Sequence, residues 1–309
     1  MAGKEMISVV LPAYNEAESV EWVIDKTREA LDSGGYNYEI LLVDDASTDN
    51  TAELAEQKNV RVVRRARNQG SGAARKTGIL EAKGEIIAMM DVDGSYDPAD
   101  LPAMLAEIES YDMINGVREQ ERGTLKFLRV PTKWLLKKLA EFLSGQKIPD
   151  LNTGMKVFRK SVIKRYFWAI PDGFSCVTSM TLALVTNGHR LGYVPIRYHK
   201  RIGKSKFHPI KDTAKYLQTI VRLVIYFDPM KFFLPLSLGV FLIGVIKTIY
   251  DWFFVIQKMQ LSDIVIILAG IMLFVLGIVS DLIVSQTKHF SHIVAQLSEQ
   301  LPNREDQKP

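Results

Sequence analysis

Short apolar runs alternate with helix-spaced stretches along the N-terminal part of the chain. Each of the first four runs is followed by a segment whose apolar residues recur at helical spacing. The five runs, in chain order, are ISVVLPAY, YEILLVDD, VRVV, EIIAMM and YDMINGV. Continuous apolar strands separated by single helices are typical of a parallel sheet covered on both faces. The pattern therefore predicts an α/β fold built on a mostly parallel sheet.

The C-terminal third has a different pattern, with two long apolar stretches. Residues 232–246 and 264–280 carry no charge, but each is slightly short for a hydrocarbon core of about 30 Å. Extending them to residues 256 and 285 makes both long enough, and it brings in Lys247 and Asp251, which lie four apart and are expected to pair on one helix face. A buried hairpin of a soluble domain is the alternative. Neither stretch has a polar face, which favours two membrane spans.

Basic residues around these spans predict their orientation. The linker QKMQLSD is short, so the spans form a hairpin with both ends on one side. The outer ends are flanked by Arg222, Lys231, Lys288 and Arg304, whereas the linker holds only Lys258. By the positive-inside rule, the N-terminal domain and both termini are cytoplasmic. The expected organisation is a cytoplasmic α/β domain at 1–208, a juxtamembrane amphipathic helix at 209–230, two membrane helices at 231–286 and a cytoplasmic tail at 287–309.

A further amphipathic segment, PTKWLLKKLAEFLSG, covers residues 131–145. Its apolar residues share one helical face, and its lysines lie elsewhere. This is the pattern of a surface helix on the protein core, or of an interfacial helix against anionic lipid. The residues alone leave both interpretations open.

Charge and cysteine content exclude some classes. The formal net charge is +4, and the basic residues form no continuous run, which argues against a nucleic-acid binder. Cys176 is the only cysteine of the sequence, so an intrachain disulfide is impossible and a reducing compartment is the simpler expectation.

Acidic residues stand at the ends of two apolar runs. In AMMDVDGSYDP, Asp91 and Asp93 sit one residue apart directly after a buried run. Such neighbours repel each other unless a cation lies between them. A tight turn is the plain alternative. Asp44 and Asp45 end another run at the same predicted sheet edge, where open α/β folds bind ligands. Together they favour a site for a ligand with ribose hydroxyls and a metal-bound diphosphate.

Four segments in the observed order and spacing resemble the family 2 glycosyltransferases, which have the GT-A fold. These segments are VVLPAYNEAESV, LLVDDASTDNT, NQGSGAARKTGI and MMDVDGSYDP. Further on, DLNTGMKVFRK, RIGKSK and the two-helix anchor resemble the polyprenyl-phosphate glycosyltransferases, which include dolichyl-phosphate mannose synthases. The resemblance covers nearly the whole chain. It implies inverting transfer of a sugar from a UDP- or GDP-linked donor to dolichyl or undecaprenyl phosphate.

The resemblance also implies roles for individual residues. Asp91 and Asp93 match the Asp-x-Asp motif that binds Mg²⁺ or Mn²⁺, and Asp44 and Asp45 match the aspartates that hold the base or ribose. Asp150 matches an acidic position before the family's Gly-Phe-Arg/Lys segment, here Gly154 to Lys156. The residues assigned to the donor site are Pro12, Tyr14, Glu16, Asp44, Asp45, Gly70, Asp91 and Val92. One departure is the Asp-x-Asp loop, which lacks the glutamine of many mannose synthases and weakens an assignment to GDP-mannose.

Basic residues are the candidates for the acceptor side. A lipid phosphate is already anionic, so positioning and charge neutralisation matter more than a strong base. No histidine near the motifs is a convincing base. His189 and His199 flank a strand and His208 lies in a basic loop, and each has either a structural role or a phosphate contact. The predicted acceptor-phosphate residues are Arg118, Arg122, Arg129, Lys133, Arg201, Lys204, Ser205 and Lys206. The predicted catalytic residues are Asp93, Asp150, Arg118 and Arg201. RIGKSKFHP, residues 201–209, is either a clamp over that phosphate or a basic loop that only attracts anionic headgroups.

Other functions are weighed against this one. The glycines of GSGAAR resemble a dinucleotide-binding turn, but Arg75 replaces the third glycine. The segment also follows the third predicted strand, whereas a dinucleotide-binding turn follows the first. In the resembling family this loop starts a helix whose amides suit a phosphate or close backbone packing. A processive polysaccharide synthase would need a Gln-x-x-Arg-Trp motif, which is absent. Transfer to another lipid or glycan acceptor, and a non-catalytic nucleotide-sugar-binding scaffold, stay open. The expected partners are the donor, the lipid phosphate and the membrane, and the sequence leaves a homo-oligomer open.

Overall fold

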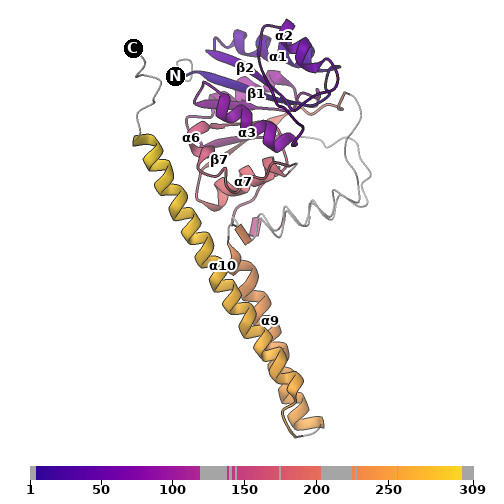
Figure 1. The fold of residues 1–309 in the computed structure, drawn as a ribbon, viewed down its shortest axis with the longest axis vertical. Helices are drawn as coiled ribbons and strands as arrows, with labels where there is room; N and C mark the ends of the chain where they lie inside the picture. Colours follow the sequence, from indigo (N-terminus) through magenta and orange to yellow (C-terminus); the bar gives the residue numbers. More distant parts are fainter. Residues whose placement is uncertain are drawn as a thin grey trace. The chain divides into compact units, whose positions relative to one another are not determined.

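The protein was analysed as a computed structural model, which describes residues 5–118, 138, 141–142, 145–173, 175–202, 225–226, 228–255 and 257–300. The chain divides into two compact units, Met1–Leu217 and Gln218–Pro309. The first holds a sheet with helices, and the second holds two long helices (Figure 1). The predicted juxtamembrane helix at 209–230 and the amphipathic segment at 131–145 lie almost entirely outside the described residues.

One sheet of seven strands organises the first unit, in the order β3-β2-β1-β4-β6-β5-β7. The strands are β1 (Ile7–Ala13), β2 (Tyr38–Asp44), β3 (Arg61–Arg64), β4 (Ile86–Met89), β5 (Met113–Arg118), β6 (Lys156–Arg159) and β7 (Leu191–Ile196). The five predicted apolar runs are β1 to β5, so the mostly parallel α/β sheet is confirmed. Sequence analysis missed β6, which runs antiparallel to both β4 and β5. This strand brings residues 150–156 beside the strand that precedes Asp91.

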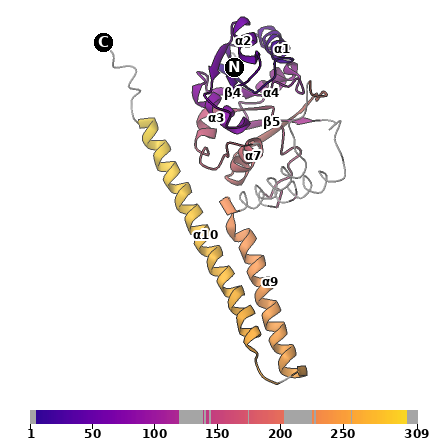
Figure 2. The ribbon, with the colours of Figure 1, turned by 45° about the vertical axis from the view of Figure 1, so that its right-hand side comes forward.

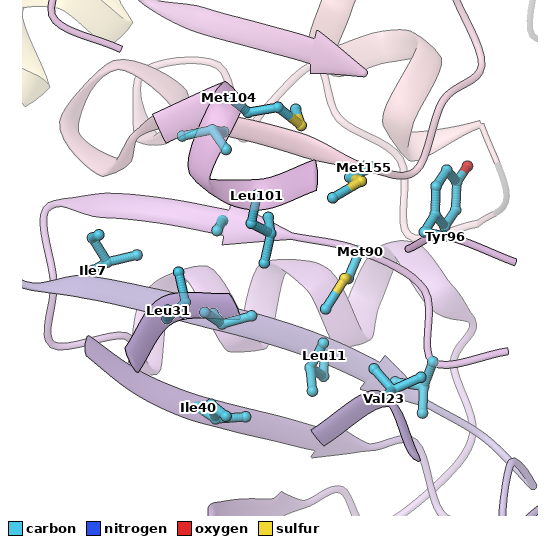
Figure 3. Close-up of a cluster of buried hydrophobic side chains, with 14 of the residues drawn as sticks. Ile7, Leu11, Val23, Leu31, Ile40, Met90, Tyr96, Leu101, Met104 and Met155 are labelled. Carbon is cyan, nitrogen blue, oxygen red and sulfur yellow. The ribbon is translucent and has the colours of Figure 1, made fainter. Parts of the chain in front are cut away.

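Helices cover both faces of the sheet. Successive side chains of β1 point to opposite faces, so the apolar residues of this strand need cover on both. The described helices of this unit are α1 (Val20–Ser33), α2 (Thr51–Gln57), α3 (Ser71–Glu81), the 3₁₀ turn η1 (Pro98–Asp100), α4 (Leu101–Ala106), α6 (Lys160–Lys164) and α7 (Cys176–Thr186). Ile7 and Leu11 of β1 pack on one face with α1 and α4, and Figure 3 shows part of this buried cluster. Val10 points to the other face, where its side chain closely approaches Gly78 of α3. The core is therefore two apolar layers with the sheet between them.

The second unit is a helical hairpin. Its elements are α9 (Pro229–Tyr250), a π-helical turn η2 (Asp251–Val255) and α10 (Leu261–Gln300). The two helices run side by side (Figure 2). Segments long and apolar enough to cross a membrane are Pro229–Val255 and Leu261–Thr287, in agreement with the predicted spans. α10 continues to Gln300, so helix extends well into the segment predicted to be a tail.

Charged side chains meet where the hairpin turns. Lys247 Nζ lies 2.6 Å from Asp251 Oδ2, which confirms the predicted pair, and 2.5 Å from Asp263 Oδ1. The Ser262 hydroxyl lies 3.0 Å from the same nitrogen. Asp263 is fully buried between the helices. Because a charged group in an apolar setting needs a partner, this cluster holds the register of α9 against α10.

Candidate active site

Three neighbouring parallel strands end at one edge of the sheet, and an acidic residue follows or ends each. β1 leads to Glu16, β2 ends at Asp44 with Asp45 after it, and β4 leads to Asp91 and Asp93. β1 pairs in parallel with both β2 and β4, so these carboxylates gather at a common edge. The sequence prediction of one acidic edge is therefore confirmed.

The loops after β1 and β2 are fastened to each other. Pro12 pairs in register with Val43 of β2, so the segment that leads to Tyr14 lies beside β2. The Asn15 amide donates to the Ser47 hydroxyl at 2.9 Å, and the Glu16 amide donates to the Thr51 hydroxyl at 2.9 Å. These bonds give the predicted nucleotide-binding edge a fixed backbone.

The carboxylate of Asp45 organises the start of α3. It is buried, accepts from Arg65 Nη1 at 2.5 Å and accepts from the Gly70 amide at 2.8 Å. Asp44 accepts from the Ser47 amide at 3.2 Å. Both aspartates predicted to hold the base or ribose thus also shape the loops around them.

Close backbone packing explains the glycines of GSGAAR. Gly70 has a φ of +98°, which L side chains rarely adopt, and a Cβ at Gly72 would lie 2.5 Å from the Pro171 carbonyl oxygen. The Ala73 amide donates to the Asp172 carbonyl at 2.9 Å. Of the two interpretations of this loop, the structure therefore shows the packing of residues 171–173 against the helix start.

Asp91 and Asp93 each lie beside a different arginine side chain. Arg75 Nη2 donates to Asp91 Oδ1. Arg201 Nε lies 3.5 Å from Asp93 Oδ2, while its Nη2 lies 2.5 Å from Glu16 Oε1. Burial, and then the neighbouring charge of Asp91, raise the pKa of Asp93, although Ser95 and Arg201 oppose the shift. Arg201 therefore joins the acidic ends of β1 and β4, which places a predicted acceptor residue against predicted donor residues.

Arg118 and Asp150 form a second pair, beside this edge. Arg118 Nε donates to Asp150 Oδ2 at 2.7 Å and Nη2 donates to Oδ1 at 2.9 Å, a bidentate geometry. The guanidinium also lies 5.1 Å from the centre of the Tyr198 ring. Burial would raise the pKa of Asp150, but the hydrogen bonds and charge of Arg118 outweigh it and lower that pKa. Asp150 is therefore an ionised partner that orients Arg118.

Tyr96 contacts residues that lie beside both the Arg75–Asp91 pair and the Arg118–Asp150 pair. Its ring meets the Tyr198 ring edge-on with centres 5.3 Å apart, and its hydroxyl accepts from the Gly154 amide at 2.6 Å. A Cβ at Gly154 would lie 2.5 Å from Asp91 Oδ2. Sequence analysis missed Tyr96, whose only signal is its place in the Asp-x-Asp loop.

One predicted donor-site residue is buried, and six predicted acceptor residues lie outside the described part of the chain. Val92 is buried in the core under the Asp-x-Asp loop rather than open at its surface. The predicted acceptor residues Arg122, Arg129, Lys133, Lys204, Ser205 and Lys206 are not among the residues that the structure describes. Their roles stay predictions.

The histidines that flank β7 have polar protein partners. His189 Nε2 lies 2.9 Å from the Tyr166 hydroxyl, and its Nδ1 lies 3.2 Å from Asp112 Oδ2. His199 Nε2 lies 3.7 Å from Asp97 Oδ2. Of the two interpretations of these histidines, a structural role is the one these contacts favour.

Among the described residues, the acidic side chains of this edge offer oxygen atoms as metal ligands. Within the described residues, no group of three or more histidine, cysteine or acidic side chains surrounds a common point. Asp91 and Asp93 supply two carboxylates, one of them with a raised pKa. Mg²⁺ and Mn²⁺ suit one or two carboxylates completed by substrate phosphates, so this pair fits a cation that arrives with a diphosphate.

Lys156 is a buried cation that sequence analysis did not single out as functional. Its amine is inaccessible to solvent and donates to Asn115 Oδ1 at 2.6 Å and Thr181 Oγ1 at 2.7 Å. Both partners are neutral. Burial lowers the pKa of Lys156 to about 7. A lysine inside an apolar strand, MKVF, was the available signal.

Replacing Lys156 with methionine is expected to change stability in a pH-dependent way. Between about pH 7 and the usual lysine value of 10.5, the unfolded chain holds a proton that the folded protein lacks. Raising the pH through this window therefore stabilises the wild type, by a total on the order of a few kcal/mol. The Lys156→Met variant lacks this gain, so its stability relative to the wild type is highest near pH 7 and declines at higher pH.

Thermal unfolding of both proteins at about pH 6.5 and about pH 9.5 tests this expectation. Loss of the hydrogen bond to Asn115 lowers the stability of the variant by the same amount at both pH values. The change of the stability difference with pH therefore reports only the titration of the Lys156 amine. Lys200→Met, at an exposed position, is the control. A Lys156→Met difference that stays constant with pH would contradict the assignment.

This chain is similar to known glycosyltransferases. Residues 8–167 match the model of glycosyl transferase family 2, and residues 228–285 match the model of the GtrB C-terminal hairpin. The chain is 28% identical to the dodecaprenyl-phosphate galacturonate synthase of Rhizobium johnstonii, over 90% of this chain and 87% of that protein. It is 27% identical to the glycosyltransferase AglJ of Haloferax volcanii, over 92% and 96%.

Solved structures with the same fold include glucosyl-3-phosphoglycerate synthase from Mycobacterium tuberculosis. Its complex with Mn²⁺, UDP-glucose and phosphoglyceric acid has a TM-score of 0.57 at 20% identity, and covers 72% of this chain and 79% of that chain. A complex with phosphoglyceric acid has a TM-score of 0.56 at 22% identity, with the same coverage. These similarities confirm the predicted GT-A fold. The family model covers more than half of the chain, and this protein therefore belongs to glycosyl transferase family 2, with a GtrB-type hairpin at its C-terminal end.

Proposed function

We propose that this glycosyltransferase moves a sugar from a UDP- or GDP-linked donor to a polyprenyl phosphate, with inversion at the anomeric carbon. The observation that carries the proposal is the meeting of Glu16, Asp93 and Arg201 at one sheet edge. Carboxylates predicted for the donor side and an arginine predicted for the acceptor side thus lie in contact. One of the named relatives supports the lipid acceptor, since it is a dodecaprenyl-phosphate galacturonate synthase and the match covers 87% of its length.

The donor would bind along the carboxyl ends of β1, β2 and β4. Tyr14 and the loops held by Asp44 and Asp45 lie where a nucleoside would be received, and Asp91 and Asp93 lie where its diphosphate would end. Asp91 and Asp93 would hold Mg²⁺ or Mn²⁺. When bound, the cation supplies positive charge that stabilises the departing diphosphate. The solved glucosyl-3-phosphoglycerate synthase complex with Mn²⁺ and UDP-glucose supports this arrangement by its fold.

The acceptor phosphate would be positioned by arginines. Its oxygen attacks the anomeric carbon as the bond to the diphosphate breaks, so the phosphate oxygen becomes the glycosidic oxygen and the nucleotide leaves. The attacking oxygen is anionic at neutral pH, and no proton has to be removed. Arg201 would neutralise and orient it, and Arg118, held by Asp150, offers a second planar guanidinium.

The hairpin would anchor the enzyme beside its lipid substrate. Its two apolar helices and the match to the GtrB hairpin support membrane association. The greater number of basic residues at the outer ends supports a cytoplasmic catalytic domain with both termini on the same side.

Radiolabel transfer tests the proposal. The full chain in detergent is incubated with undecaprenyl or dolichyl phosphate and a panel of labelled UDP- and GDP-sugars. We expect label to enter an organic-extractable lipid with one donor, to require a divalent cation, and to form the anomer opposite to that of the donor. Donor binding without turnover would instead identify a scaffold, and label in a lipid-free polymer would identify a polysaccharide synthase.

A further inference from the structure

Arg75 of α3 holds one oxygen of Asp91 from inside the protein. Its Nη2 donates to Asp91 Oδ1, and its side chain is only 5% exposed. The Asp91 side chain is 33% exposed. The arginine is thus out of reach of a ligand, whereas the carboxylate that it contacts is accessible. Residues placed in this way support and orient a side chain that binds a metal.

The other oxygen of Asp91 is confined from the opposite direction. A Cβ at Gly154 would lie 2.5 Å from Asp91 Oδ2, so only glycine leaves room for the carboxylate. Gly154 is itself fixed, because its amide donates to the Tyr96 hydroxyl at 2.6 Å. Asp91 is therefore held between α3 and the chain entering β6. Its rotamer is set before any ligand arrives.

The position of Arg75 is also fixed by its helix. α3 begins at residues bound by Asp45 and by the Asp172 carbonyl, at 2.8 Å and 2.9 Å respectively. Burial is the largest influence and would lower the pKa of Arg75, but the charge of Asp91, together with smaller contributions that include Asp93, outweighs it and raises that pKa. Its Nε has no hydrogen-bond partner among the described residues. The buried charge of Arg75 is thus stabilised chiefly by the Asp91 carboxylate.

We propose that Arg75 is a positioning residue of the donor site, which fixes Asp91 Oδ1 so that Oδ2 is presented to the divalent cation of the nucleotide-sugar complex. This inference rests on the proposed function. Its physical basis is preorganisation: a carboxylate held in one rotamer loses less entropy on binding than a free one. Arg75 also offsets one of the two neighbouring negative charges before the cation binds.

Binding of Mn²⁺ in the presence of UDP or GDP tests the role of Arg75. The electron paramagnetic resonance signal of free Mn²⁺ is measured with the full chain in detergent. We expect Arg75→Met to raise the Kd for Mn²⁺ by about 10- to 100-fold, as loss of a supporting partner does at metal sites. Arg75→Lys keeps the charge without the planar fork and should fall between. Lys76→Met, the next residue of α3, should bind as the wild type does.

A second variant covers the case in which Arg75→Met does not fold. Gly154→Ala leaves the buried charge intact but pushes Asp91 Oδ2 from the other side, and it should also weaken Mn²⁺ binding by about tenfold or more. Gly173→Ala is its control, since nothing lies within 4 Å of a Cβ there. Thermal unfolding confirms that each variant is folded.

The outcomes separate this inference from the proposed function. If the wild type binds Mn²⁺ with nucleotide and the folded Arg75 and Gly154 variants bind equally well, the positioning role is wrong and the proposed function stands. If the wild type itself binds no Mn²⁺ with either nucleotide, the metal part of the proposed function fails, and the inference fails with it. A merely structural role would lower the unfolding temperature without moving the Kd.

Discussion

Replacing Asp93 with asparagine is expected to lower sugar transfer by about 10²- to 10³-fold or more while the fold survives. Asp93 lies in the loop that follows β4, and its Oδ2 lies 3.5 Å from Arg201 Nε. The variant keeps the size of the side chain and removes the charge that would hold the cation of the donor. Metal-dependent transfer in the radiolabel assay is the measurement.

The same substitution is expected not to lower stability. Burial raises the pKa of Asp93, so its ionised form is less favourable in the folded protein than in the unfolded chain. A raised carboxyl pKa contributes stability at acidic pH that is lost as the pH rises through the folded-state value. At neutral pH the neutral asparagine therefore removes an unfavourable charge. Asp172→Asn, at an exposed aspartate, is the control. Near-normal metal-dependent turnover by Asp93→Asn would refute the site assignment.

Replacing Arg201 with alanine is expected to lower kcat by about 10²-fold without weakening donor binding. In the structure Arg201 contacts Glu16 and Asp93. A bound donor and its cation would compete for these carboxylates, which would free the guanidinium for the acceptor phosphate. Loss of Arg201 therefore removes the acceptor contact, and it leaves donor affinity unchanged or tighter.

Single-turnover transfer at saturating lipid phosphate, together with donor titration, separates these effects. Arg197→Ala is the matched control, because Arg197 lies four residues earlier and pairs with Asp97 and Asp100 instead. Weaker donor binding by Arg201→Ala would make Arg201 a donor ligand. Normal transfer would exclude the clamp, and Arg118, Arg122 and Arg129 would become the candidates for the acceptor phosphate.

Local pattern was sufficient to predict much of the fold. β1 and β4 are continuous apolar runs that are buried along their whole length, and their identity depends on burial on both faces rather than on any distant partner. The hairpin was predictable for a similar reason, because two long apolar stretches without a polar face favour two long apolar helices. β6 was not predictable, since KVFR has four residues and becomes a strand only through pairing with β4 and β5.

The sequence by itself determined the family, the acidic sheet edge and the paired charges of the hairpin. Asp44, Asp45, Asp91 and Asp93 stand at the ends of apolar runs, and parallel strands bring such ends together whatever the rest of the chain does. Lys247 and Asp251 meet because four residues make about one helical turn. These features follow from spacing along a single element or from a rule that all parallel sheets obey.

Only the tertiary structure decided which cation meets which carboxylate. Arg75 and Asp91 lie 16 residues apart, Arg118 and Asp150 lie 32 apart, and Arg201 and Glu16 lie 185 apart. Each pair forms where separate elements converge on the sheet edge, and a long side chain could have reached several alternatives. Lys156 became buried because β6 inserted between β4 and β5, which turned its amine toward α7. Spacing along the chain carries no information about such contacts, because their geometry depends on how all the elements pack.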